Sequence, residues 1–353
     1  MAQHPSALVI GHRGASGYRP EHTRAAYELA YALGADAVEP DIVATRDGVL
    51  VIRHENEISS TTDVAQHPEF ADRRTTKEID GQQVIGWFTE DFTWAELATL
   101  RARERLGELR SLSRSFDGCY PILRLSELFE IADAAALRAE RPIGIVAEIK
   151  HPTYFAGLGL PLDELFAAEL ADSGWEQDAL IVECFEQSAL ADVRRRGVAS
   201  ESVYLIEASG APADRVARDG SAAVGYARDI APAGLASIAA GEGDKKVHGV
   251  SVNARLLVQG GNTDESDAGG GPAMPVLLEP APVVADAHAV GLGVFCWTLR
   301  AENRFLAEPF RSGDGEAAIG DWRGQFEFVL GLGVDGVFAD QPDLAVAARD
   351  ESG

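Results

Sequence analysis

Titratable side chains gather at the ends of short apolar runs in the first half of the chain. They are His12 with Arg13, Glu39 with Asp41, His54, and Glu148 with Lys150. Imidazoles exchange protons near neutral pH, carboxylates bind cations, and Arg and Lys bind phosphate oxygens. Together, these residue types predict cleavage of a phosphodiester at a metal site.

The acids favour a hard cation. Alternation along a strand places Glu39 and Asp41 on one face, and Glu148 and Lys150 on one face of another strand. Two inward-facing acids are costly to desolvate unless a positive charge compensates. Three carboxylates without a neighbouring thiolate suit Ca²⁺ or Mg²⁺ better than zinc. We therefore expect one divalent cation, either Ca²⁺ or Mg²⁺, on Glu39, Asp41 and Glu148.

The basic residues fit an anionic substrate. Arg13 can hold two phosphate oxygens in its planar fork, and Lys150 can act as a point charge. Gly11 and Gly14 would let the backbone approach a ligand closely. His12 and His54 would be the proton-exchanging pair.

Each of these features also has a purely structural interpretation. A histidine at a strand end often makes structural hydrogen bonds, the Glu39–Asp41 pair could form solvated salt bridges, and Lys150 could pair with Glu148. His22 could cap a helix, as could Thr23, a favourable N-cap residue. The coincidence of these residues at the same end of consecutive strands favours a site.

Alternating strand-like and helical runs predict a parallel sheet covered by helices. We count nine strand-like runs, at 7–11, 37–45, 49–54, 143–149, 179–185, 202–206, 249–253, 294–299 and 336–340. Asp47-Gly48 predicts that 37–45 and 49–54 form a hairpin, which leaves eight strands for a (β/α)8 TIM barrel over 1–353. A two-residue turn would place Asp41 opposite His54.

Helical patterns occupy 22–34, 125–139, 162–174, 188–197, 281–291 and 326–333. Residues 55–120 interrupt the alternation and predict a small inserted subdomain, with a helix at 94–106. Residues 259–275 predict a flexible loop, and 307–324 an irregular insert.

Composition excludes several classes of protein. Hydrophobic residues make up 46% and charged residues 25% of 353 residues, so the chain is globular, and no apolar run is long enough for a membrane span. A net charge of -25 would repel nucleic acid and anionic membranes. Because the first residues include neither a basic segment nor an apolar stretch of about 7–15 residues, we expect no leader in the sequence as given. We expect a cytoplasmic protein as given, or a periplasmic or secreted one if a leader has been removed; the sequence does not indicate the oligomeric state.

Four blocks resemble the glycerophosphodiester phosphodiesterase family. They are HRGASGYRPEHT (12–23), GADAVEPDIVATRDGVLVIRHE (34–55), VAEIK (146–150) and GVDGVFADQPD (333–343). The stretch 61–102 is similar to the inserted subdomain of the longer, bacterial periplasmic-type branch, so the resemblance covers nearly the whole chain.

The resemblance implies a TIM barrel that hydrolyses glycerophosphodiesters, such as glycerophosphocholine, to sn-glycerol 3-phosphate and an alcohol. It assigns acid/base catalysis to His12 and His54, metal binding to Glu39, Asp41 and Glu148, and phosphate binding to Arg13 and Lys150. In the family, a glycerol hydroxyl is thought to attack phosphorus, and water then opens the cyclic phosphate. The longer branch typically uses Ca²⁺.

The chain departs from the family pattern at two places. Glu55 replaces the Asp that usually follows the second histidine, with a mild cost in rate if that acid orients the histidine. Ala339 replaces a Thr before Asp340.

Phe185 and Trp297, at later strand ends, could form an aromatic wall for glycerol or a choline head group, or could belong to the core. Two alternative functions stay open. One is a lysophospholipase D-type phosphodiesterase, and the other is a non-catalytic glycerophosphodiester-binding protein.

Overall fold

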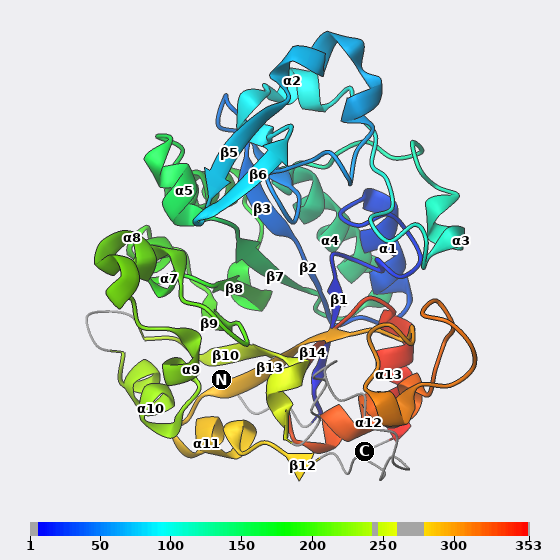
Figure 1. The fold of residues 1–353 in the computed structure, drawn as a ribbon, viewed down its shortest axis with the longest axis vertical. Helices are drawn as coiled ribbons and strands as arrows, with labels where there is room; N and C mark the ends of the chain where they lie inside the picture. Colours follow the sequence, from blue (N-terminus) through cyan, green and yellow to red (C-terminus); the bar gives the residue numbers. More distant parts are fainter. Residues whose placement is uncertain (1–5, 242–245, 260–278, 352–353) are drawn as a thin grey trace, which may run out of the picture.

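Eight parallel strands form a closed barrel, as predicted. The computed structural model describes residues 6–241, 246–259 and 279–351. The strand order is β2-β1-β14-β13-β10-β9-β8-β7, and pairing of β2 with β7 closes the ring (Figure 1). The barrel strands are β1 (Leu8–His12), β2 (Ala37–Glu39), β7 (Gly144–Ile149), β8 (Leu180–Cys184), β9 (Glu201–Ile206), β10 (Gly249–Asn253), β13 (Gly293–Leu299) and β14 (Gly336–Ala339).

Helices surround the barrel on the outside (Figure 1). They are α1 (Arg24–Ala32), α4 (Leu125–Ala139), α5 (Pro152–Gly157), α6 (Leu162–Ser173), α7 (Gln187–Arg195), α8 (Ala213–Asp219), α9 (Tyr226–Asp229), α10 (Pro232–Ala240), α11 (Val283–Ala289), α12 (Trp322–Gly331) and α13 (Pro342–Glu351). None of the helices in the described part of the chain has the length and apolar character that a membrane crossing requires.

The predicted hairpin is present, but its register differs by one residue. Strand β3 (Asp41–Ala44) continues β2 beyond Pro40 and pairs antiparallel with β4 (Leu50–Ile52), with Val43 opposite Val51. The turn holds three residues instead of two, because Gly48 takes a left-handed φ of 78°. Arg53 therefore lies opposite Asp41, to whose carbonyl its N–H donates at 2.9 Å, and the predicted pairing of Asp41 with His54 is wrong.

The segment 55–120 lies between β4 and α4. It contains the hairpin of β5 (Thr75–Ile79) and β6 (Gln82–Gly86), with α2 (Trp94–Leu97) and α3 (Ser111–Arg114), mostly at the top of Figure 1. Buried side chains such as Trp87 and Phe92 belong to the main hydrophobic core. The assignment of this segment as a subdomain stays a prediction.

The helix predicted at 94–106 is wrong beyond Leu97. The backbone N–H of Ala102 donates to the carbonyl of Tyr120 at 2.8 Å, and the carbonyl of Arg101 accepts from Asp63 at 3.0 Å. These long-range backbone bonds replace the helical ladder.

Other boundaries follow local sequence. Thr23 caps α1, because its side chain accepts from the N–H of Ala26 at 3.2 Å. Within the predicted irregular insert at 307–324, Glu308–Phe310 forms one 3-10 turn, and α12 begins at Trp322. Residues 260–275 of the predicted flexible loop lie outside the described residues.

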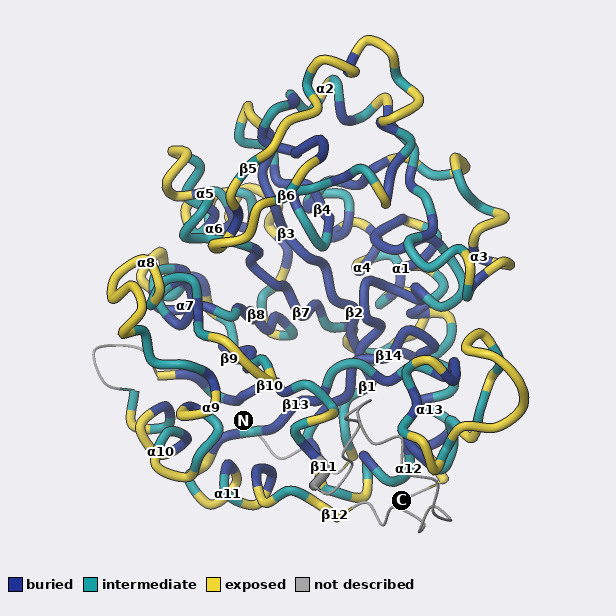
Figure 2. The backbone as a smooth tube through the Cα atoms, in the orientation of Figure 1, coloured by how far each residue is buried: buried dark blue, intermediate teal, exposed yellow. Residues whose placement is uncertain are grey.

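The buried residues form two clusters. The larger one packs between strands and helices, so that the buried backbone in Figure 2 runs along the barrel while the outer turns are exposed. The smaller one fills the barrel interior, with Ile10, Ala37, Val146, Ile181, Val203, Phe295 and Phe338. Each of these seven residues comes from a different barrel strand, as expected for an inward-facing layer.

Candidate active site

The inner layer sets the position of the polar residues above it. Because side chains alternate along a strand, the residue two positions after each inner-layer residue faces the same way. These residues are His12, Glu39, Glu148, Glu183, Leu205, Trp297 and Asp340. They lie at the C-terminal ends of the strands, where TIM barrels carry their chemistry.

His12 ends β1 and is held by an acid that follows β14. Its Nδ1 lies 2.6 Å from Oδ1 of Asp340, and its Nε2 lies 3.8 Å from Oε2 of Glu39. A carboxylate accepts, so Nδ1 carries the proton and Nε2 is free to act as a base. Burial and the charge of Arg13 lower the pKa of His12 to about 4, which keeps the imidazole neutral near pH 7.

His54 follows β4 and is held in the same way. Its Nδ1 lies 2.5 Å from Oε1 of Glu55, so the longer acid found in place of Asp orients the imidazole. Burial, together with Arg13 and Lys150, lowers the pKa of His54. Both histidines line the same cavity.

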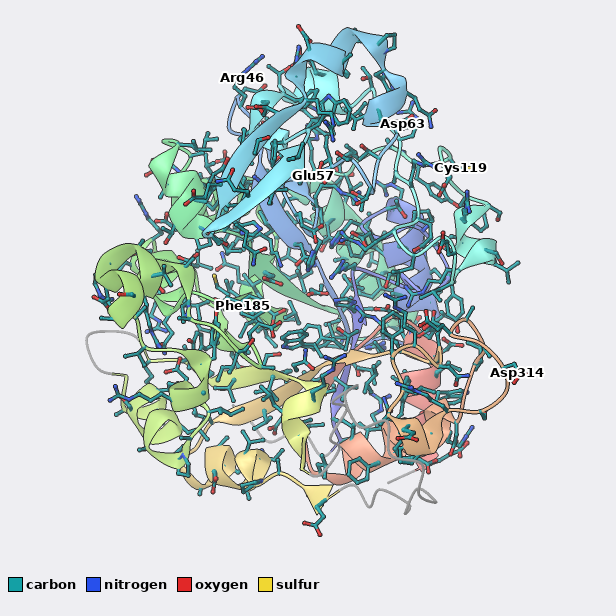
Figure 3. The ribbon with its side chains drawn as sticks, in the orientation of Figure 1. Arg46, Glu57, Asp63, Cys119, Phe185 and Asp314 are labelled. Atoms are coloured by element: carbon teal, nitrogen blue, oxygen red, sulfur yellow. The ribbon has the colours of Figure 1, made fainter. Side chains whose placement is uncertain are left out.

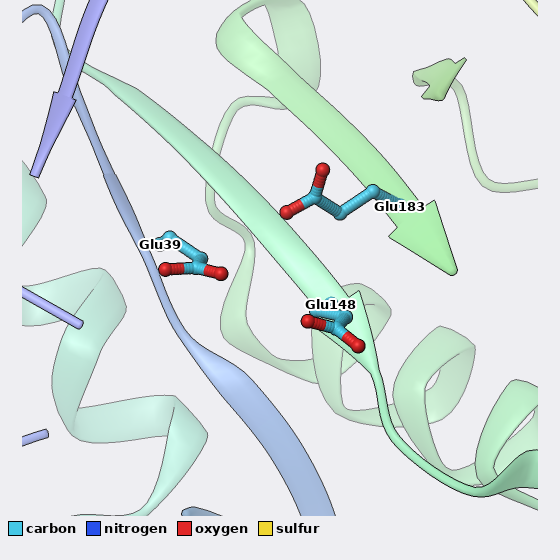
Figure 4. Close-up of side chains that lie close together, drawn as sticks. All are labelled: Glu39, Glu148 and Glu183. Carbon is cyan, nitrogen blue, oxygen red and sulfur yellow. The ribbon is translucent and has the colours of Figure 1, made fainter. Parts of the chain in front are cut away.

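Three glutamates converge beside the histidines. One oxygen from each of Glu39, Glu148 and Glu183 lies within 4.8 Å of the other two (Figure 4). All three are buried, and neither oxygen of Glu183 has a hydrogen-bond partner. Oxygens bound to one Ca²⁺ lie up to about 5 Å apart, since each is at about 2.3–2.6 Å from the ion, so this spacing fits a cation.

A positive charge would stabilise the ionised forms of the three clustered glutamates. Burial, with repulsion by Asp41 and Glu148, raises the pKa of Glu39 well above its usual range. Burial also raises the pKa of Glu148 to about 8, although Lys150 opposes the shift. The pKa of Glu183 is raised by burial and by the other acids. A divalent cation would remove the repulsion that holds these protons.

Asp41, the third predicted ligand, is held differently from the three glutamates. Its Oδ2 lies 2.7 Å from Nε2 of His22, and its Oδ1 lies 3.8 Å from Nζ of Lys150. Burial opposes ionisation, but Lys150 and the histidines outweigh it and hold the pKa of Asp41 well below its usual range. The interpretation of His22 as a helix cap is wrong. Its ring is hydrogen-bonded to Asp41 and Tyr27, and Thr23 provides the cap.

The two predicted phosphate-binding residues differ in their access to the cavity. Lys150 lines it, with Nζ 2.8 Å from Oε1 of Glu148. Arg13 is buried beside it, where Nη1 donates to Glu21 at 3.1 Å and Nε lies 3.6 Å from Asp41. Phosphate binding by Lys150 and Arg13 stays a prediction.

The cavity has a volume of about 620 Å³ and lies at the mouth of the barrel. Phe185 and Trp297 both line it, with ring centroids 5.9 Å apart and planes at 86°, and both also pack against buried apolar residues. Phe185 lies toward the middle of the molecule, whereas Cys119 and Asp314 lie at its periphery (Figure 3). The two aromatic rings therefore fit both the pocket interpretation and the core interpretation.

Sequence reasoning missed Glu183 and Asp340 as site residues. Glu183 is an acid inside the apolar run 179–185, two positions after Ile181, and Asp340 directly follows a strand. The alternation and strand-end rules applied to the other acids would have found both.

Comparison with known proteins identifies relatives along most of the chain. The model of the glycerophosphoryl diester phosphodiesterase family matches residues 12–344. Glycerophosphodiester phosphodiesterase GDPD6 of Arabidopsis thaliana is 31% identical over 345 residues, covering 94% of this chain and 82% of the relative. "Probable glycerophosphodiester phosphodiesterase 1" of Mycobacterium tuberculosis is 30% identical over 303 residues, covering 85% and 83%.

Solved structures share the fold. An Oleispira antarctica phosphodiesterase, in complex with the product sn-glycerol-3-phosphate, superposes with a TM-score of 0.60 at 19% identity, covering 98% of this chain and 97% of that one. A glycerophosphodiester phosphodiesterase from Agrobacterium tumefaciens gives a TM-score of 0.55 at 15% identity, covering 97% and 99%.

Proposed function

Because the chain belongs to the glycerophosphoryl diester phosphodiesterase family, a family of phosphoric diester hydrolases, we propose that it hydrolyses glycerophosphodiesters to sn-glycerol 3-phosphate and an alcohol. The observation that carries this proposal is the pair of imidazoles at one cavity. Asp340 and Glu55 each hold one Nδ1, which leaves both Nε2 atoms as the proton-exchanging atoms. The product in the Oleispira antarctica complex supports the same reaction.

The two histidines share the proton transfers. In the first step, the glycerol 2-hydroxyl attacks phosphorus, the bond to the head-group oxygen breaks, and a cyclic phosphate forms. One histidine is neutral, and its bare Nε2 accepts the proton of the attacking hydroxyl. The other enters the step as imidazolium, a form that the negative charge of the bound diester favours, and its Nε2–H donates the proton to the departing alkoxide. In the second step water opens the ring, and the two histidines exchange roles.

A divalent cation, Ca²⁺ or Mg²⁺, completes the proposed site. Glu39, Asp41 and Glu148 are its proposed ligands, and Glu183 is a fourth candidate. The buried, unpartnered oxygens of Glu183 and the raised pKa values of Glu39 and Glu148 support a cation among them. When bound, the cation would neutralise phosphate oxygens and lower the pKa of the attacking hydroxyl. Lys150 and Arg13 are the proposed phosphate contacts, so local positive charge offsets the net charge of -25.

The role of Glu183 can be tested by metal affinity. We expect Glu183→Gln to weaken Ca²⁺ binding by about tenfold or more, because an amide keeps the shape but removes one negative charge from the ligand set. Isothermal titration of the metal-free protein measures the dissociation constant without any need for turnover. Glu186→Gln, at the same cavity but outside the cluster, is the matched control. An unchanged affinity in Glu183→Gln would exclude Glu183 as a ligand.

The lining of the cavity suits a cationic head group. Phe185, Trp297 and Tyr226 line it, together with the acids Asp80, Glu186 and Glu207. Burial and nearby acids raise the pKa of Glu186 to about 7, so a ligand cation beside it would be stabilised by its ionisation. Aromatic faces attract quaternary ammonium groups. These features support glycerophosphocholine as a substrate.

The aromatic wall makes a specific prediction. Cation–π contacts contribute about 0.5–2 kcal/mol, so Trp297→Ala should raise the KM for glycerophosphocholine by about 2- to 30-fold. The KM for glycerophosphoglycerol, whose head group is neutral, should change less. Steady-state kinetics on both substrates tests this, and an unchanged KM for glycerophosphocholine would assign Trp297 to core packing alone.

The reaction itself is tested with purified protein and a substrate panel. We expect release of sn-glycerol 3-phosphate from glycerophosphocholine in the presence of Ca²⁺ or Mg²⁺. Turnover of lysophosphatidylcholine to lysophosphatidate, without turnover of glycerophosphocholine, would indicate the lysophospholipase D-type alternative. Binding of glycerophosphocholine without cleavage, measured by calorimetry, would indicate a binding protein.

A further inference from the structure

Two arginines in the segment between β4 and α4 contact acids at the barrel mouth. Arg105 and Arg110 flank one turn between α2 and α3. Each contacts an acid that holds Nδ1 of one of the two histidines. Arg105 contacts Glu55, which holds His54, and Arg110 contacts Asp340, which holds His12.

Arg105 donates hydrogen bonds to both carboxylate oxygens of Glu55. Nη1 donates to Oε1 of Glu55 at 2.9 Å, and Nη2 donates to Oε2 at 2.5 Å. The same guanidinium donates from Nε and Nη2 to Glu21 at 2.9 and 2.8 Å. A bidentate contact fixes the carboxylate plane. It therefore fixes the direction in which Oε1 of Glu55 presents itself to His54.

Arg110 acts on Asp340 from a buried position. Its Nη2 donates to Oδ2 of Asp340 at 2.6 Å, while Oδ1 of the same acid faces His12. Nε of Arg110 donates to Glu302 at 2.6 Å, and Nη1 donates to the carbonyl of Ser16 at 3.1 Å. Burial opposes ionisation of Asp340, but Arg300, Arg110 and His12 outweigh it and hold its pKa well below the usual range.

The turn that carries both arginines is fixed by its own hydrogen bonds. Glu104 accepts from the N–H of Leu106 at 2.8 Å and from the hydroxyl of Ser113 at 2.5 Å. The N–H of Glu104 donates to Asp117 at 2.7 Å. These bonds within the segment help to fix the backbone from which the two arginines extend.

We propose that Arg105 and Arg110 are positioning residues that orient the two histidines through Glu55 and Asp340. The inference rests on the proposed roles of His12 and His54. It gives the segment 55–120 a function, since this segment completes the orientation of both imidazoles from outside the barrel. The ion pair of Arg105 with Glu55 is partly exposed, with 25% and 35% of the side chains accessible. Exposed pairs contribute little to stability, and the buried Glu21 that Arg105 also contacts would keep Arg13 and Arg53 as ion-pair partners, so loss of Arg105 should affect orientation more than folding.

The test compares Arg105→Ala, Glu55→Ala and the double variant, with Arg103→Ala as the control. Arg103 lies in the same connection but pairs with Asp117 instead of a site residue. Loss of a group that orients a functional histidine typically costs about 10- to 100-fold. We expect kcat for glycerophosphocholine to fall about tenfold or more in Arg105→Ala, with KM within about threefold and kcat partly restored in Arg105→Lys.

The double variant separates positioning from general disruption. If Arg105 acts through Glu55, removing it in the Glu55→Ala background should change kcat by no more than about twofold. Multiplying effects, or a kcat within about twofold of wild type in Arg105→Ala, would overturn the inference. Because Arg110 is buried, Arg110→Lys is the variant for its pair with Asp340, and thermal unfolding checks that it folds. We again expect kcat to fall while KM stays nearly unchanged.

A readout independent of turnover keeps this inference distinct from the proposed function. The Nδ1–H proton of His54 should give a slowly exchanging signal in histidine-labelled NMR spectra of the wild type, and Arg105→Ala should broaden or abolish it. A chain that shows this loss but never cleaves a glycerophosphodiester would support the positioning and refute the function. Cleavage of the diester by the wild type, together with an unchanged signal in Arg105→Ala, would support the proposed function and refute the positioning role.

Discussion

His12→Ala and His54→Ala should each lower kcat for glycerophosphocholine by about two to four orders of magnitude. General acid–base catalysis contributes about 10²- to 10⁴-fold, and in the proposed mechanism each imidazole carries the proton for one side of the reacting phosphate. The fold should survive either change. Asp340 would keep its bonds to Arg110 and Arg300, and Glu55 would keep its bonds to Arg105, so neither substitution leaves an unpaired buried acid.

Kinetics with matched thermal unfolding curves measures both parts of this prediction. His67→Ala is the control, because His67 pairs with Asp63 and Glu69 in the insert and does not line the cavity. A folded variant of His12 or His54 that keeps more than about a tenth of wild-type kcat would contradict the role of that histidine.

Removal of divalent cations should abolish turnover, and Ca²⁺ or Mg²⁺ should restore it. Without a cation, burial and repulsion keep protons on Glu39 and Glu148, so these carboxyls are neutral and the phosphate oxygens lack a metal partner. With a cation, the carboxylates are neutralised and the phosphate oxygens gain a positive partner. Activity after EDTA and gel filtration, followed by add-back of each ion, measures the effect.

Thermal unfolding gives an independent check on the metal site. A ligand that binds the native state stabilises it by about 2.7 kcal/mol at 100 times its dissociation constant, so the active ion should raise the Tm of the metal-free protein. Comparison of EGTA with EDTA distinguishes Ca²⁺ from Mg²⁺ as the ion that purifies with the chain. Full turnover in protein shown to be metal-free by elemental analysis would contradict metal dependence.

Most of the barrel and part of the site follow from local sequence. The alternation of apolar runs predicted the strands, and the strand-end rule placed His12, Glu39 and Glu148 at one mouth because parallel strands share an orientation. The same rule would have added Glu183. The hairpin register was wrong because Asp-Gly suits both two-residue and three-residue turns, and only the observed Gly48 conformation decides between them.

The remaining contacts have no local signal. Arg105 reaches Glu55 across 50 residues, and Arg110 reaches Asp340 across 230 residues. The turn that carries them lies in a stretch whose pattern predicted a continuous helix. That helix ends at Leu97 because backbone pairing with distant segments replaces its ladder. Tertiary contacts of this kind override local propensity and cannot be obtained from residue spacing.

Metal-dependent hydrolysis of glycerophosphodiesters can be followed directly in a phosphorus NMR time course of the purified chain with glycerophosphocholine and Ca²⁺ or Mg²⁺. We expect the diester resonance to be replaced by that of sn-glycerol 3-phosphate, with choline released in equal amount. A diester resonance that stays unchanged with either ion, or is replaced by that of phosphocholine, would contradict the proposed reaction.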